Sequence, residues 1–264
     1  MIRVAVAGAA GRMGTACREA LAGADDLELV ACIDRAPMAD ADSAPEAEAF
    51  DSVAEALVAT HPDVFVDFTA PGSVEGNIRA ALAAGVDCVV GTTGLSAATL
   101  EALEAEIPQG TCLFVAPNFA IGAVLLMQLA ARAARWMPDV EIIELHHNQK
   151  KDAPSGTAIR TAELIVAARA DAGVTPLGAP GAESEIGGYE GARGARAEDI
   201  PVHSIRLPGL VAHEEVIFGG PGQTLTLRHD SLDRVSFMPG VLAACRAVGQ
   251  RSGLIVGLEN LIEL

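Results

Sequence analysis

The chain has 264 residues, half of them hydrophobic but only 3% aromatic, which predicts one large or two modest globular domains with aliphatic cores. Its 35 acidic residues outnumber the 18 basic ones and give a net charge of −17. So acidic a surface repels phosphates and anionic lipid, which argues against nucleic-acid and membrane partners. Only two of the basic residues are lysines, and they are adjacent: Lys150 and Lys151.

The sequence favours a cytoplasmic protein. No apolar run approaches the 18 or so residues that would span a bilayer, and residues 1–6 lead directly into a strand-like run without a basic leader. The cysteines are odd in number, scattered and without a C-x-x-C pair, so we expect buried thiols in a reducing compartment and no metal site. They are Cys17, Cys32, Cys88, Cys112 and Cys245.

The first half of the chain alternates strand-like with helix-like segments. Five short runs rich in Val, Ile, Phe or Cys predict buried parallel strands: Ile2–Ala7, Leu27–Asp34, Val64–Phe68, Cys88–Val90 and Thr111–Val115. Helices are expected to begin near Arg12, Ser52, Ser73 and Ser96, with the three serines as N-caps and Gly85 closing the third helix. This repetition predicts an α/β fold with a Rossmann-type doubly wound parallel sheet, and an exposed loop over Asp40–Asp51.

After Phe119 the pattern changes to that of an α+β domain. We expect helices at Ile121–Trp136 and from Gly156 to about Ala170, a strand at Val140–His147, and a loop over Asp171–Asp199. Three antiparallel strands are expected at Val202–Leu207, Val211–Phe218 and Thr224–His229, the last two joined through residues 219–222. A final helix, Val241–Val248, precedes an apolar tail.

A glycine-rich turn follows the first strand and reads Gly8-Ala9-Ala10-Gly11-Arg12-Met13-Gly14. Glycines here let backbone N–H groups approach a pyrophosphate at the start of a helix. Asp34 stands twenty residues beyond Gly14, where an acid binds the ribose of a dinucleotide, and Arg35 beside it could bind a 2′-phosphate. The pattern therefore indicates NADH or NADPH binding. The alternative is a turn that serves packing alone.

Two later loops follow predicted strands at the edge where ligands of such sheets bind. They are Gly91-Thr92-Thr93-Gly94 and Ala116-Pro117-Asn118-Phe119. Either would be an ordinary turn by itself, but together with the glycine-rich turn they extend the candidate cofactor site.

Residues 144–157 concentrate two of the six histidines and both lysines in an otherwise acidic chain. Lysine, unlike arginine, can give up a proton when its pKa is lowered, so Lys150 is a candidate proton donor. Ser155, Gly156 and Thr157 open a helix and would present N–H groups and hydroxyls to an anion. The segment thus predicts a small anionic substrate, such as a carboxylate, held by His and Lys and reduced by hydride from a nicotinamide.

A metal site at His146 and His147 is the weaker interpretation. Adjacent strand residues point to opposite faces, and no third ligand has suitable spacing. The two histidines could share a site only if the strand ends between them.

These motifs resemble the dihydrodipicolinate reductase family, that is, 4-hydroxy-tetrahydrodipicolinate reductase of the bacterial diaminopimelate–lysine pathway. The resemblance covers nearly the whole chain, from the glycine turn through residues 91–94, 116–119 and 144–157 to 200–237. It implies NAD(P)H-dependent reduction of a small dicarboxylate with loss of water, and a homotetramer. It also implies a Rossmann domain of residues 1–120 and 232–264, and an inserted substrate and oligomerisation domain of residues 121–231.

Carried over to this chain, the resemblance implies His146 and Lys150 as proton donors. It implies that His147, Gly156 and Thr157 bind substrate carboxylates, and we add Ser155 to them as the helix cap. The implied cofactor residues are Gly8–Met13, Asp34, Arg35, Gly91–Thr93 and Ala116–Phe119. Asp34 stands where many relatives carry Glu, which leaves the choice between NADH and NADPH open. Lys151 is expected to be solvated.

Two other functions remain open on the residues alone. Another two-domain NAD(P)-dependent amino-acid or oxo-acid dehydrogenase would share the glycine turn but has no need of the His146–Lys150 cluster. A non-catalytic NADPH-binding regulator would keep the turn and lose the proton donors.

Overall fold

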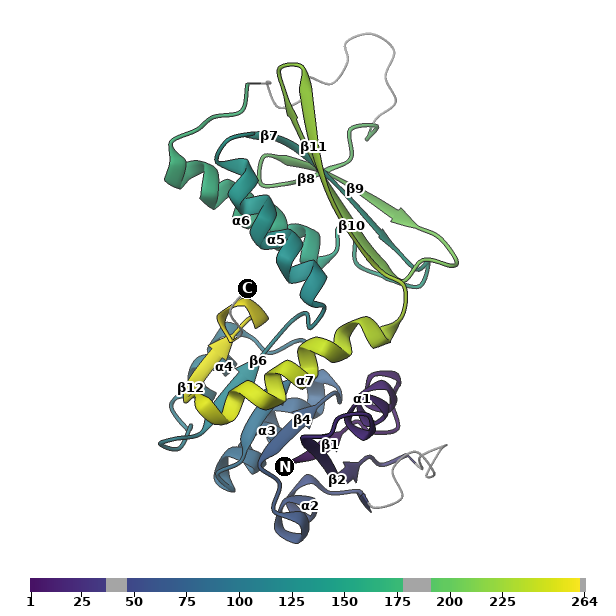
Figure 1. Cartoon of the computed structure of the whole chain (residues 1–264), viewed down its shortest axis with the longest axis vertical. Helices are drawn as coiled ribbons and strands as arrows, with labels where there is room; N and C mark the ends of the chain where they lie inside the picture. Colours follow the sequence, from purple (N-terminus) through teal and green to yellow (C-terminus); the bar gives the residue numbers. More distant parts are fainter. Residues whose placement is uncertain (37–46, 178–190, 262–264) are drawn as a thin grey trace. The chain divides into compact units, whose positions relative to one another are not determined.

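The computed structural model describes residues 1–36, 47–177 and 191–261. Its chain divides into two compact units, one of Met1–Ile121 with Arg234–Leu264 and one of Gly122–Asp233 (Figure 1). Among the described residues, no helix is both long and apolar enough to cross a lipid bilayer.

The first unit is built on a seven-stranded sheet in the order β12-β6-β5-β4-β1-β2-β3, with every neighbouring pair parallel. Its strands are β1 (Ile2–Ala7), β2 (Leu27–Ile33), β3 (Glu48–Phe50), β4 (Val64–Asp67), β5 (Asp87–Val90), β6 (Cys112–Val115) and β12 (Gly253–Val256). The central strands are buried on both faces, as expected for a parallel sheet covered by helices.

Helices cover both faces of this sheet, so the predicted doubly wound α/β fold is confirmed (Figure 1). Helix α1 packs on α7, and α2 packs on α3. The helices are α1 (Arg12–Ala22), α2 (Val53–Thr60), α3 (Pro71–Ala83), α4 (Ala97–Glu104) and α7 (Met238–Ala247), with short 3-10 turns η2 (Arg234–Phe237), η3 (Val248–Gln250) and η4 (Leu258–Asn260). All five cysteines are buried here as free thiols.

Two predictions for this unit need correction, and one segment without an assigned structure forms a strand. Glu48–Phe50, placed in an exposed loop, forms the edge strand β3, while residues 37–46 of that loop lie outside the described residues. Ser73 does not cap α3, because Pro71, whose φ is already helical, starts the helix two residues earlier with Ala70 as N-cap. The apolar tail adds strand β12, which pairs with β6. The N-caps Ser52 and Ser96 are confirmed, and Gly85 follows α3 with φ +70°.

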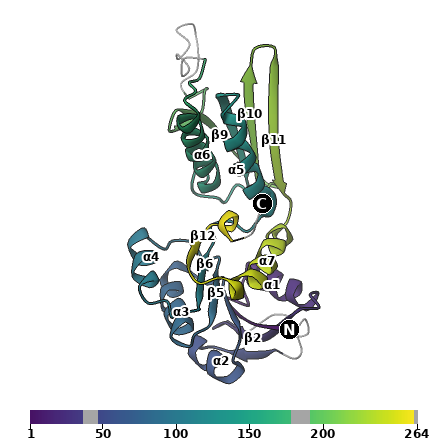
Figure 2. The same ribbon diagram turned by 60° about the vertical axis from the view of Figure 1, so that its left-hand side comes forward.

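The second unit is a mixed five-stranded sheet in the order β11-β10-β7-β9-β8. It comprises β7 (Asp139–His146), β8 (Ala195–Ala197), β9 (Ile200–Arg206), β10 (Ala212–Gly220) and β11 (Gln223–Ser231), with helices α5 (Ile121–Ala134) and α6 (Gly156–Ala172). Both helices bury apolar residues against the sheet, around Ile142, Val216 and Phe218 (Figure 2).

The hairpin of β10 and β11 is antiparallel as predicted, and Gly220 pairs with Gln223 across its turn. The prediction for the third strand is wrong: β9 pairs in parallel with β7 and antiparallel only with the short β8. Strand β8 itself lies within the expected loop over Asp171–Asp199, of which residues 178–190 are not described. Strand pairing is decided by partners far along the chain, which local alternation does not reveal.

Candidate active site

The glycines of the turn between β1 and α1 stand where a side chain would not fit. A Cβ at Gly8, whose φ is +76°, would lie 2.4 Å from the carbonyl oxygen of Phe68, and one at Gly14 would lie 2.1 Å from that of Gly8. Gly11 is the N-cap of α1 and supplies no side chain to cap it, so the first N–H groups of the helix are left for a ligand. The backbone is therefore built for the close approach of an anion.

Asp34 ties this turn to the end of β2. Its Oδ2 accepts a hydrogen bond from Ala10 N at 2.9 Å and its Oδ1 accepts one from Ala36 N at 3.0 Å. Each carboxylate oxygen keeps a further lone pair that a ribose hydroxyl could use. Arg35, next to it, is exposed.

A cleft of about 650 Å³ opens at this carboxyl edge of the sheet. Its lining includes the predicted residues Gly8, Gly11, Asp34 and Arg35. Its other polar lining residues were not predicted: Asp51, Ser52, Thr69, Ser73 and Asn77. The signal that points to Thr69 is its place directly after β4, at the same edge as the other loops.

Asp67, the last residue of β4, organises this edge. Although it has no exposed surface, its carboxylate accepts hydrogen bonds from Thr69 N (3.0 Å), Thr69 Oγ1 (2.7 Å), Asn77 Nδ2 (2.8 Å) and Thr92 Oγ1 (2.6 Å). One buried carboxylate thus holds the loop after β4, the helix α3 and the loop after β5 in place.

The two later loops both contact Phe68, which lines the cleft. A Cβ at Gly91 would lie 2.2 Å from the Phe68 ring. The Phe119 ring packs edge-on against the same ring, with 6.1 Å between the ring centroids. Asn118 Oδ1 accepts from Ala120 N at 2.9 Å. Ala116 is buried, whereas Thr93 and Pro117 are exposed. In the glycine-rich turn between β1 and α1, the predicted residue Ala9 is buried and Arg12 is exposed.

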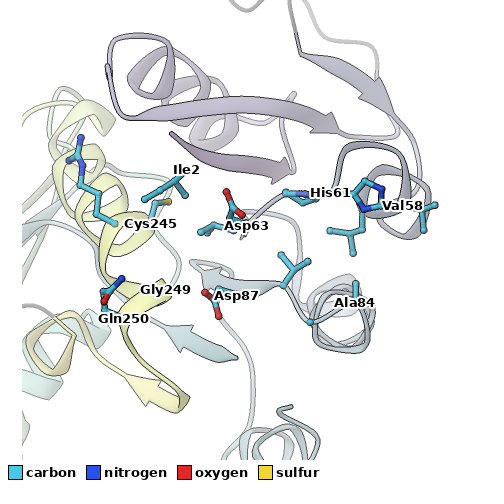
Figure 3. Close-up of a pocket in the computed structure, with 15 residues that line it drawn as sticks. Ile2, Val58, His61, Asp63, Ala84, Asp87, Cys245, Gly249 and Gln250 are labelled. Carbon is cyan, nitrogen blue, oxygen red and sulfur yellow. The ribbon is translucent and has the colours of Figure 1, made fainter. Parts of the chain in front are cut away.

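A second cavity, of about 680 Å³, lies at the opposite edge of the sheet. It is lined at the amino ends of three strands by Ile2, Asp63 and Asp87, with His61 and Gln250 nearby (Figure 3). Asp63 accepts from Arg3 N at 2.8 Å and Asp87 from Cys112 N at 2.7 Å, so both carboxylates brace the backbone. Ligands of doubly wound sheets bind at the carboxyl edge, so the first cleft is the candidate ligand site.

In the second unit, His146 ends β7 and forms a buried ionic cluster. Its Nδ1 lies 2.6 Å from Oε2 of Glu144, which has no exposed surface. Arg206 of β9 donates to both oxygens of the same carboxylate, through Nη1 at 2.8 Å and Nη2 at 2.7 Å. Neither Glu144 nor Arg206 was given a role from the sequence.

Glu144 is held as a carboxylate by these partners. Burial alone would raise its pKa, but hydrogen bonds from His146, Arg206 and Ser204 lower the pKa to about 2. The carboxylate of Glu144 beside Nδ1 orients the imidazole, so Nε2 is the ring nitrogen that a ligand could contact.

Lys150 lies in the turn after β7, where its N–H donates to His147 O at 3.1 Å. Its ammonium pairs with Asp152 Oδ2 at 2.8 Å. Arg206 Nη2 also donates to the Asp152 carbonyl at 2.8 Å, so one guanidinium links the His146 cluster to the Lys150 turn. His147 is half-buried beside them, whereas Lys151 is exposed.

Helix α6 begins at the end of this segment. Ser155 is its N-cap, is buried, and accepts from Ala158 N at 3.2 Å through its Oγ. The hydroxyl is thus engaged in the cap, whereas Gly156 is exposed and Thr157 half-buried at the first two helical positions. Their N–H groups, together with the helix dipole, suit a carboxylate. No group of three or more potential ligands among the described residues could hold a metal ion.

Comparison with known proteins identifies the family. Residues 2–119 match the family model of the dihydrodipicolinate reductase N-terminus, and residues 122–262 match that of its C-terminus. The chain belongs to the dihydrodipicolinate reductase family.

Relatives in this family match along their whole length. The 4-hydroxy-tetrahydrodipicolinate reductase of Syntrophomonas wolfei is 48% identical over 98% of both chains. That of Nocardia farcinica is 48% identical over 100% of this chain and 99% of its own.

Solved structures agree with this placement. The dipicolinate-bound dihydrodipicolinate reductase of Paenisporosarcina sp. TG-14 is 42% identical, with a TM-score of 0.85 over 99% of this chain and 100% of its own. An amine dehydrogenase of Mycobacterium smegmatis has a TM-score of 0.64 over 100% of this chain and 96% of its own, at 16% identity, so it shares the fold alone.

Proposed function

We propose that this chain catalyses the NAD(P)H-dependent reduction of (2S,4S)-4-hydroxy-2,3,4,5-tetrahydrodipicolinate, with loss of water, to tetrahydrodipicolinate in the diaminopimelate route to lysine. The observation that carries this proposal is a cluster of His146, Glu144 and Arg206 in a chain that matches the family along its full length. Arg206 and Lys150 both bind Asp152, so the cluster is linked to Lys150. A dehydrogenase of another class, or a regulator without catalysis, would have no use for that cluster.

The nicotinamide nucleotide fits the cleft of the first unit. Its pyrophosphate would lie on the glycine-rich turn of Gly8 to Met13, with Asp34 toward the adenosine ribose and Arg35 available to a 2′-phosphate. The loops of Gly91–Thr93 and Ala116–Phe119 would complete the site. When bound, the nucleotide supplies the hydride. We expect both NADH and NADPH to serve.

The second unit would hold the dicarboxylate and supply protons. The N–H groups of Gly156 and Thr157, with His147, bind a carboxylate, and the Ser155 hydroxyl caps the same helix end at Ala158 N. The reduction adds one proton for each hydride. We assign this proton transfer to His146 Nε2 and Lys150 Nζ. Glu144 orients the imidazole of His146, and Asp152 forms an ion pair with Lys150.

Membership of the family supports a proposal for assembly and location. We propose that the protein works as a homotetramer in the cytoplasm and that residues Gly122–Asp233 form both the substrate and the assembly domain.

The direct test incubates the protein with freshly generated product of the preceding aldol condensation and follows nicotinamide absorbance. We expect oxidation of NADH and NADPH that depends on both the protein and the condensation product. No oxidation above background, or oxidation with amino or oxo acids instead, would refute the proposal.

A further inference from the structure

Glu214, on β10, is a buried carboxyl that the proposed reaction does not use. It is 5% exposed, and its Oε1 has no hydrogen-bond partner among the residues that the structure describes. The side chain that interacts with it through a hydroxyl is Thr161 on α6, which has no exposed surface. A half-satisfied buried carboxyl costs stability, which calls for a function.

The position of Glu214 points to that function. It stands directly opposite Glu144 in the β10–β7 pairing, and Glu144 stands opposite Ser204 in the β7–β9 pairing. Side chains of directly opposed residues share one face of the sheet, about 5 Å apart at Cβ. The carboxyl that orients His146 therefore has a second carboxyl as its neighbour.

We propose that Glu214 is a positioning residue that acts on His146 through Glu144. The negative charge of Glu214 adds to that of Glu144 and strengthens the electrostatic attraction of the protonated imidazole. This inference rests on the proposed role of His146 in proton transfer.

The groups that face Glu214 come from four elements. Glu144 lies on β7 with Arg206 of β9 bound to it, Thr161 lies on α6, and His229 stands opposite Glu214 on β11. Burial raises the pKa of Glu214 to about 7, an effect that the charge of Glu144 increases and the Thr161 hydrogen bond opposes. Burial also lowers the pKa of His229. Arg206 binds both oxygens of Glu144 and helps to keep that carboxyl ionised. Of the two carboxyls, Glu214 is therefore the one that changes charge near neutrality.

Thr161 gives this change a structural counterpart. Its hydroxyl has one proton, which it donates to Thr157 O at 3.0 Å. Protonated Glu214 can donate to the Thr161 oxygen and leave that bond intact, whereas ionised Glu214 must attract the same proton. The ionised form adds a second negative charge beside Glu144, on the face of the sheet that also carries His146.

The test compares wild-type protein with Glu214→Gln, which keeps the shape and removes the charge. The His146 ring signal is titrated by NMR, assigned with a His146→Gln variant, and kcat is measured against pH. We expect the apparent pKa of His146 to fall by about 1 unit, the usual effect of one nearby charge, and the alkaline limb of kcat to move by a similar amount to lower pH. Glu214→Asp, which keeps the charge, should restore most of the wild-type curve.

Glu215→Gln is the matched control. Glu215 is the next residue along β10, stands opposite Ile143 instead of Glu144, and pairs with Arg228 at 2.6 Å. The Glu215→Gln variant should leave the NMR titration curve of His146 unchanged. Thr161→Val offers a second variant should Glu214→Gln unfold, and it should also displace the His146 titration. Superimposable curves for wild type and the Glu214 or Thr161 variant would overturn the inference. The NMR titration needs no substrate, so it decides this point even if the protein failed to turn over and the proposed function fell.

Discussion

His146 Nδ1 and Glu144 Oε2 lie 2.6 Å apart, within a sheet where the Glu144 carboxylate has no contact with solvent. Arg206 closes the cluster by binding both oxygens of Glu144. Such a bidentate pair fixes the carboxylate in position as well as in charge. The geometry of His146 is therefore set by Glu144 of its own strand β7 together with Arg206 of the neighbouring strand β9.

Acid should destabilise the protein through Glu144. Its pKa of about 2 in the folded protein lies below the ordinary 4.5. Its contribution to the free energy of unfolding is therefore present above pH 4.5 and is lost as the pH falls toward 2. The shift corresponds to about 3 kcal/mol of unfolding free energy. Denaturant unfolding at a series of pH values should show a shallower loss in acid for Glu144→Gln than for wild type. Parallel curves would contradict this role.

The same variant should be less stable at neutral pH. Removing one partner of a buried pair leaves the Arg206 charge without compensation, at a cost of about 3–5 kcal/mol. A loss well below 1 kcal/mol, measured by denaturant titration, would mean that solvent reaches the pair.

Gly8→Ala should abolish nucleotide binding, because its Cβ would meet the Phe68 carbonyl at 2.4 Å in a backbone with φ +76°. Strain of this kind costs about 1–3 kcal/mol, and the turn must shift to relieve it. Gly76→Ala is the control: it lies within α3 with nothing within 4 Å, so it should bind nucleotide normally and gain about 0.5–1 kcal/mol of stability. Calorimetric titration with NADH or NADPH measures the binding, and normal affinity in Gly8→Ala would refute the assignment.

Arg35→Ala should weaken NADPH binding about 10- to 100-fold and leave NADH nearly unchanged, since only NADPH carries the 2′-phosphate. Asp34→Ala should weaken both nucleotides, because Ala10 N also loses its acceptor. Dissociation constants for the two nucleotides with each variant check this pair of expectations. Equal losses for NADH and NADPH in Arg35→Ala would remove Arg35 from phosphate recognition.

Lys150→Met should lower kcat about 100- to 10,000-fold with little change in nucleotide affinity, the usual effect of losing a general acid. Lys151→Met is the adjacent control, since Lys151 is exposed, and it should retain near-normal turnover. Steady-state kinetics and nucleotide titrations on both variants separate the two lysines. Equal effects at both positions would indicate a general electrostatic role.

The sequence predicts the elements of this protein better than their partners. Short continuous apolar runs indicate β1, β2 and β4, because parallel strands that are buried on both faces are hydrophobic along their length. The edge strand β3 is missed because its residues are largely exposed, and the parallel pairing of β9 is missed because its partner β7 lies some sixty residues earlier.

The candidate site divides in the same way. Gly8, Asp34 and the 146–157 segment belong to contiguous motifs, so their residue types and spacing are informative. Arg206 and Asn77 reach their carboxylates only through the fold, and no spacing rule connects Arg206 to Glu144 across 62 residues. The engagement of the Ser155 hydroxyl in a helix cap likewise depends on the exact start of α6.

Hydride transfer itself is the most direct test of the proposed reaction. The protein would be incubated with nicotinamide nucleotide deuterated at the transferable position and with the freshly generated condensation product, and the reduced ring would be analysed by mass spectrometry. We predict a tetrahydrodipicolinate that carries one deuterium, formed as the nucleotide is oxidised. Unlabelled product, or oxidation of the nucleotide without reduction of the ring, would contradict the proposed function.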